Sequence, residues 1–87
     1  MKTKLIGLNI KTGVGAIEAR RDNSTALIDF RIRDDGSVSK GWVKYSTTAR
    51  DLASFPAEVK ELNIEEIVKS YPDYFVFTKK EVTACWL

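Results

Sequence analysis

Residues 27–45, which read LIDFRIRDDGSVSKGWVKY, contain two stretches of alternating apolar and polar residues on either side of an Asp-Gly pair. In the first stretch every second residue is apolar, which is the period-2 pattern of a strand that is buried on one face. Asp35-Gly36 is the dipeptide most typical of a two-residue β-hairpin loop. We therefore expect a strand over residues 26–33, a tight turn, and a returning strand over residues 38–46.

A two-residue loop at Asp35-Gly36 also predicts which residues of the two strands face each other. It places Arg31 opposite Lys40 and Asp29 opposite Trp42, and successive side chains alternate between the faces of the sheet. One face then gathers the apolar residues, which are Ile28, Phe30, Ile32, Val43 and Tyr45. The other face gathers Asp29, Arg31, Arg33, Lys40, Trp42 and Lys44. We expect the first face to be core, with Arg31 and Lys40 as cross-strand neighbours beside Trp42.

The residues before the hairpin predict two further strands. Alternation of apolar residues at Ile6, Leu8 and Ile10 predicts the first strand, and residues 16–21 predict a second with Ile17 and Ala19 on one face. Residues 12–15, TGVG, form a turn or a bulge. Residues 22–25 have the Asp, Asn and Ser composition of a turn. The N-terminal half therefore predicts a four-stranded antiparallel sheet.

The chain changes to helical patterns after the hairpin. Thr48, with Asp51 three residues on, is typical of the N-terminal cap of a short helix through residue 54. Pro56 breaks or restarts this helix, and a second piece follows over residues 57–62.

Asn63, with Glu66 three residues on, predicts the cap of a further helix that ends at Tyr71, because Pro72 follows it. Residues 74–77 read as a short strand. The tail, residues 78–87, fits either a helix or a strand, and its Thr-x-x-Glu start favours a helix. Together these patterns predict one α+β domain over residues 1–87. An antiparallel four-stranded sheet in the N-terminal half is packed by two or three short helices from the C-terminal half.

Composition excludes several kinds of chemistry. The 87 residues contain no histidine and a single cysteine, Cys85. A Ser/His or Cys/His nucleophile and a four-cysteine zinc site are therefore ruled out. We expect no enzyme activity, no cofactor and no metal. No apolar run approaches the roughly 18 residues of a membrane span, the N-terminus lacks the apolar core of a signal peptide, and one cysteine suits a reducing compartment. A cytoplasmic protein is expected.

Charge is spread unevenly along the chain. Residues 1–50 contain ten Lys and Arg against five Asp and Glu, whereas residues 51–87 contain four against seven. Such asymmetry suggests that the first half faces an anionic partner. The alternative is that the helices of the second half simply have Glu-rich solvent faces.

The polar face of the hairpin is the candidate binding site. Cations that neutralise phosphates, next to an aromatic ring on which a base can stack, are typical of single-stranded nucleic-acid surfaces. The candidate nucleic-acid-binding residues are Arg31, Arg33, Lys40, Trp42 and Lys44. In the alternative reading, Asp29 neutralises Lys40 and Lys44, and Trp42 is covered by the C-terminal segment or by a second copy of the chain.

The same residues resemble a known family. The strand 27–31 (LIDFR), the Asp35-Gly36 turn, the Lys40-Gly41 pair and the capped helix from Thr48 are similar to the PC4/p15 transcriptional-coactivator family. The resemblance covers about residues 16–62. It implies a β-β-β-β-α subunit that forms a homodimer and binds single-stranded DNA across its sheets. Arg31 and Lys40 would match family positions that contact nucleic acid.

Two functions remain open at this level. The first is a non-enzymatic single-stranded DNA- or RNA-binding protein that acts as a homodimer through its basic and aromatic sheet face. The second is a small protein-interaction module, such as a regulator or inhibitor encoded by a phage or mobile element. Its aromatic and arginine residues would then anchor a protein partner.

Overall fold

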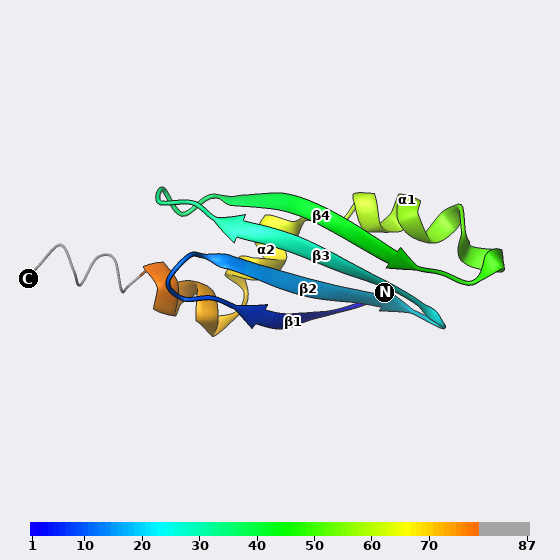
Figure 1. The fold of residues 1–87 in the computed structure, drawn as a ribbon, viewed down its shortest axis with the longest axis horizontal. Helices are drawn as coiled ribbons and strands as arrows, with labels where there is room; N and C mark the ends of the chain where they lie inside the picture. Colours follow the sequence, from blue (N-terminus) through cyan, green and yellow to red (C-terminus); the bar gives the residue numbers. More distant parts are fainter. Residues whose placement is uncertain (79–87) are drawn as a thin grey trace, which may run out of the picture.

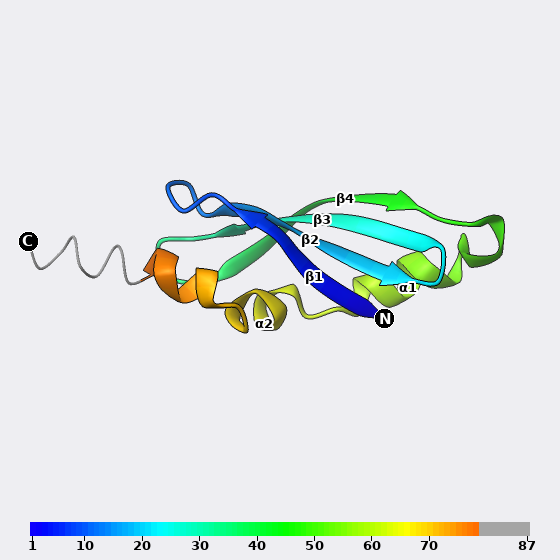
Figure 2. The same ribbon diagram turned by 90° about the horizontal axis from the view of Figure 1, so that it is seen from below.

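The computed structural model describes residues 1–78, which form a four-stranded antiparallel sheet followed by short helices (Figure 1). The strands follow the chain order β1-β2-β3-β4, and their bounds are Lys2–Leu8, Val14–Arg21, Ser24–Ile32 and Val38–Ser46. The described helices all lie on one side of the sheet, and none of them crosses the other side (Figure 2). The expected α+β architecture is confirmed.

Strand β3 is the centre of the core because its alternation is strict. Ala26, Ile28, Phe30 and Ile32 are buried, and each residue between them is exposed. From β2, Ile17 and Ala19 are also fully buried, as the sequence predicts. Phe55, Val59, Ile64, Val68 and Phe77 complete this core from the helical side.

Strand β1 differs from the sequence prediction. It starts at Lys2 and ends at Leu8, and the register with β2 shifts between Leu5 and Gly7. The extra residue of this bulge is Ile6, so Leu5 and Leu8 pack against the core while Ile6 and Ile10 are exposed. The prediction that Ile6, Leu8 and Ile10 share a buried face was therefore wrong.

The TGVG segment is a tight connection built on two glycines. Gly13 has a φ of +78° and a Cβ there would lie 2.6 Å from the Ile32 carbonyl oxygen. A Cβ on Gly15 would lie 2.5 Å from both the Gly7 carbonyl oxygen and the Phe30 ring. These glycines therefore let β1, β2 and β3 approach closely, which is the structural role that a turn or bulge predicts.

The turn between β3 and β4 is longer than predicted. The Arg33 amide donates to the Ser37 carbonyl at 2.8 Å, and the Gly36 amide donates to the Arg33 carbonyl at 2.9 Å. Three residues, 34–36, therefore form the loop, and Gly36 has a φ of +86°. The Asp35 carboxylate accepts bonds from the Ser37 amide at 2.9 Å and the Ser37 hydroxyl at 2.6 Å, which holds this longer turn.

Between the loop and a bulge in β4, the longer turn shifts the pairing of β3 with β4 by one residue relative to the predicted register. Arg31 faces Ser39 and Phe30 faces Lys40, so the predicted Arg31–Lys40 pair was wrong. The predicted register returns at Ile28, which faces Val43, and it then continues to the end of the hairpin. Between these two parts, Gly41 and Trp42 together face the single residue Asp29. We call these three residues the β4 bulge.

The first helical segment is split, but not where Pro56 predicts. A 3₁₀ turn at Ala49–Asp51 precedes α1, which spans Ser54–Lys60 and contains Pro56 in its first turn. Proline is tolerated there because the first amides of a helix have no partner within the helix. Phe55 and Val59 are one turn apart on α1 and both are buried.

Helix α2 spans Ile64–Lys69 and begins as predicted. The Asn63 side chain accepts a bond from the Glu66 amide at 3.1 Å. The Glu65 carboxylate accepts a bond from the Val38 amide at 3.0 Å, which ties α2 to the start of β4. Asn63 is therefore confirmed as an N-terminal cap.

Residues 72–78 are helical, so the predicted strand at residues 74–77 was wrong. Pro72 suits the first position of a helix, and the spacing of Tyr74 and Phe77 brings both to the core. The Tyr74 hydroxyl donates to the Gly36 carbonyl at 2.8 Å and links this helix to the hairpin loop. Of the predicted tail, residues 78–87, only Thr78 belongs to the described part, where it is helical; residues 79–87, which include Cys85, lie outside it. Within residues 1–78, no helix is long and apolar enough to cross a membrane.

Candidate functional site

The candidate site lies on the face of the sheet that the described helices leave uncovered, which we call the open face. On this face the register aligns side chains in rows across the strands. One row is Lys4, Glu18, Leu27 and Lys44, and the next is Lys2, Arg20, Thr25 and Ser46. Toward the hairpin loop lie Ala16, Asp29 and Trp42, and then Val14, Arg31 and Ser39.

Trp42 is the most exposed large apolar side chain among the described residues, at 83%. It neighbours Val43, which packs against the core, so the alternation of the strand directs Trp42 to the open face. Leu27, in the middle of the sheet, is 41% exposed on the same face. The open face therefore offers apolar surface as well as charge.

The structure brings Arg31 and Arg33 together near the hairpin loop. Both side chains, with Asp34 and Ser39, line a hollow of about 340 Å³. The Arg33 guanidinium donates to the Ser37 hydroxyl at 3.4 Å, so it is held by the same turn that Asp35 orders. A hollow with two guanidinium groups can accept an anionic group such as a phosphate.

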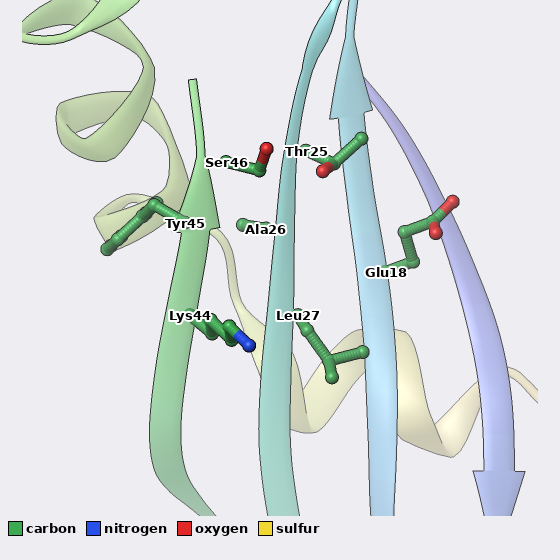
Figure 3. Close-up of a pocket in the computed structure, with 7 residues that line it drawn as sticks. All are labelled: Glu18, Thr25, Ala26, Leu27, Lys44, Tyr45 and Ser46. Carbon is green, nitrogen blue, oxygen red and sulfur yellow. The ribbon is translucent and has the colours of Figure 1, made fainter.

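Lys44 lies on the open face as predicted. Together with Glu18, Thr25 and Leu27 it lines a shallow hollow of about 220 Å³, and its side chain leans toward β3 (Figure 3). Tyr45 points to the opposite side, where its ring packs edge-to-face on Phe55 at 6.4 Å (Figure 3).

Lys40 is the predicted site residue that the structure separates from the others. It faces Phe30 across the hairpin, and Phe30 is directed to the helical side. The one-residue shift caused by the three-residue loop is the reason. Arg31, Arg33, Trp42 and Lys44 remain together on the open face.

Sequence reasoning missed the cations that β1 and β2 add to this face, which are Lys2, Lys4 and Arg20. The signal was present, because Arg20 alternates with the buried residues Ile17 and Ala19. The missing information was the start of β1 at Lys2. A strand assumed to begin at Ile6 leaves Lys2 and Lys4 outside the sheet.

Three carboxylates lie among these cations: Glu18 and Asp29 on the open face, and Asp34 in the hollow lined by Arg31 and Arg33. Glu18 lies 3.7 Å from the Arg20 guanidinium. Asp29 is exposed, and among residues 1–78 no ion pair joins it to Lys40 or Lys44. Basic residues therefore outnumber acidic ones on the face.

The helical side contains a polar network. The Asp51 carboxylate accepts bonds from the Ser24 hydroxyl at 2.9 Å and the Thr48 hydroxyl at 3.2 Å, and lies 3.2 Å from the Arg21 guanidinium. These bonds, chiefly that from Ser24, hold the pKa of Asp51 below its ordinary value. Arg21 also stacks on the Phe55 ring at 5.5 Å. The network joins the β2–β3 turn to the helices.

Among the described residues, no group of three or more His, Cys, Asp or Glu side chains is arranged to hold a metal ion. In comparisons with protein-family models, curated proteins and solved structures, nothing matches this chain. The resemblance to the PC4/p15 family remains a prediction from the sequence.

Proposed function

We propose that the open face of the sheet binds single-stranded nucleic acid, without catalysing a reaction. The observation that supports this best is the 83% exposure of Trp42 on a face where cations outnumber acids. An exposed ring at a sheet surface is a stacking partner for a base, and the surrounding cations can neutralise phosphates.

The excess of cations on the open face indicates where a nucleic acid would lie. On the helical side, the exposed acids Glu58, Glu61, Glu66 and Asp73 are accompanied by Lys40, Lys60 and Lys69, so that side has no comparable excess of positive charge. The cations of the open face attract a polyanion. A nucleic acid would therefore run along the strands, from the Arg31–Arg33 hollow to the row that contains Lys4 and Lys44.

Fluorescence anisotropy of the full chain with a labelled oligonucleotide of about a dozen nucleotides, repeated across salt concentrations, tests this directly. Binding should weaken with salt, and each of Arg31→Ala and Lys44→Ala should reduce the slope of log K against log salt by about 0.7. The matched control is Lys60→Ala on α1, which should leave the slope unchanged.

Trp42→Ala should weaken binding by about 1–3 kcal/mol, the range measured for stacking of one base on an aromatic side chain. Because Trp42 is exposed, this change should leave the thermal unfolding midpoint almost unaltered. Absence of binding to any oligonucleotide at low salt would refute the proposed function.

A protein partner is the second candidate, and the apolar part of the open face favours it. Val14, Leu27 and Trp42 are exposed on this one face, and aromatic residues with arginine are common anchors of protein interfaces. Size-exclusion chromatography with light scattering tests for a homodimer. Trp42→Ala should then shift the molecular mass to that of a monomer.

A further inference from the structure

We infer that the β4 bulge, formed by Asp29, Gly41 and Trp42, binds one base of the strand and selects guanine. This inference rests on the proposed function and assigns a base preference to the same face. It differs from a general affinity for single strands, which stacking and phosphate contacts alone would give.

The bulge places a carboxylate beside the exposed ring. Two residues of β4, Gly41 and Trp42, face Asp29 alone, so Trp42 and Asp29 are cross-strand neighbours on the open face. Gly41 has no side chain, and the nearest atoms to its Cβ position are those of Asp29, at 3.4–3.7 Å. Gly41 therefore adds no side chain of its own beside Asp29 and Trp42.

The charge of Asp29 argues against a phosphate at this position. A carboxylate repels a phosphate, and Asp29 has no cation within ion-pair distance among residues 1–78. Arg31 and Lys44 lie two residues from the bulge along their strands, about 7 Å away, where they can hold the phosphates on either side. What lies at Asp29 should instead be a group that donates hydrogen bonds.

Guanine is the base whose edge fits a carboxylate. Its Watson–Crick edge presents two adjacent donors, N1–H and N2–H, which can donate to Oδ1 and Oδ2 of Asp29 while the ring stacks on Trp42. Adenine and cytosine place an acceptor next to their amino group. Thymine and uracil place a carbonyl on each side of their single donor. Each of these would bring an acceptor against the carboxylate.

The experiment compares labelled oligothymidines that contain one central guanine, adenine or hypoxanthine, by anisotropy at low salt with the full chain. Hypoxanthine keeps N1–H and lacks the N2 amino group. The guanine oligonucleotide should bind roughly five- to tenfold more tightly than the other two, the lower end of the discrimination that a paired hydrogen bond provides.

Asp29→Asn should remove the guanine preference and raise affinity for the adenine and hypoxanthine oligonucleotides, because it removes a negative charge from the face. Glu18→Gln is the matched control, since it removes a negative charge from the same face, in the row of side chains next to that of Asp29. It should raise affinity and keep the preference.

Equal affinity for the three oligonucleotides, or a preference that survives Asp29→Asn, would overturn the assignment of guanine and leave single-strand binding standing. If none of the oligonucleotides binds, the proposed function itself fails. The two failures are therefore distinguishable in one set of titrations.

Discussion

At the scale of single residues, glycines determine how closely the strands approach. Gly15 lies where β1, β2 and the Phe30 ring meet, and a methyl group would enter the van der Waals radius of both neighbours. Gly7, on the edge strand, has no atom within 4 Å of its Cβ position. The same substitution at these two positions should therefore have different effects.

We expect Gly15→Ala to lower the free energy of unfolding by about 1–3 kcal/mol, the usual effect of overpacking. For a chain of this size, even the low end lowers Tm by about 4–8 °C. Gly7→Ala should leave Tm almost unchanged. Thermal unfolding followed by circular dichroism measures both, and equal Tm values would contradict the packing described at Gly15.

Individual residues also explain why the hairpin register was partly mispredicted. Asp35-Gly36 correctly marks a turn, but the dipeptide does not reveal that the Asp35 carboxylate binds Ser37 and lengthens the loop by one residue. A signal for the bulge was present in the sequence. Val38 and Val43 are an odd number of residues apart, so both can face the core only if the strand contains an extra residue.

At the scale of elements, β3 was predictable and β1 was not, for the same physical reason. Every second residue of β3 is apolar and buried, so its pattern has one interpretation. In β1 the bulge at Ile6 interrupts the alternation, and the edge position leaves apolar residues exposed. Short apolar runs such as residues 74–77 do not distinguish strand from helix, because burial depends on which neighbours they meet.

The β4 bulge predicts how the hairpin responds to shortening. Deletion of Gly41 would leave Trp42 alone opposite Asp29 and keep every other pair of the β3–β4 register. We expect the shortened chain to fold, with its unfolding free energy changed by about 1 kcal/mol or less, the scale of one cross-strand pair.

Deletion of Asp29 is the matched control for this prediction. It moves Phe30 and Ile32, or the residues before them, to the open face, and the chain should not fold. Circular dichroism and thermal unfolding distinguish the two deletions. A Gly41 deletion as damaging as the Asp29 deletion would contradict the bulge.

At the scale of the whole molecule, three carboxylates stabilise the arrangement of the elements. Two of them link the sheet to the helices, and the third orders the loop between β3 and β4. Asp35 binds Ser37, Asp51 binds Ser24, and Glu65 binds the Val38 amide; in each case this bond is the main cause of a lowered pKa. Because the pKa is lower in the folded chain, the stability from these groups is present above their unfolded pKa values, near 4. This stability is lost as the pH falls through the pKa values that these groups have in the folded chain.

We therefore expect Tm to be steady near neutral pH and to fall below about pH 4. Asp51→Asn should lower Tm at neutral pH and reduce the further decrease of Tm in acid, because the carboxylate that titrates is gone. Asp73→Asn, which changes an exposed carboxylate of the helical side, should preserve the full pH profile. An unaltered acid transition in Asp51→Asn would contradict the role of this network.

The candidate site was only partly predictable at this scale, because it combines residues from all four strands. The hairpin alone indicates Arg31, Trp42 and Lys44. The contribution of Lys2, Lys4 and Arg20 depends on the order of the strands in the sheet. The prediction that Lys40 lies on the open face was wrong, because one additional turn residue changes the face of every β4 side chain between the loop and the bulge.

The bond from the Val38 amide to the Glu65 carboxylate has a consequence for aggregation. Strand β4 is an edge of the sheet, and an unpaired edge amide is where the strand of another molecule can add. The Glu65 carboxylate accepts a hydrogen bond from that amide at the start of β4, and the bulge interrupts the edge further along. This end of β4 is thereby protected against edge-to-edge polymerisation, and a variant that frees the Val38 amide should form fibrils more readily.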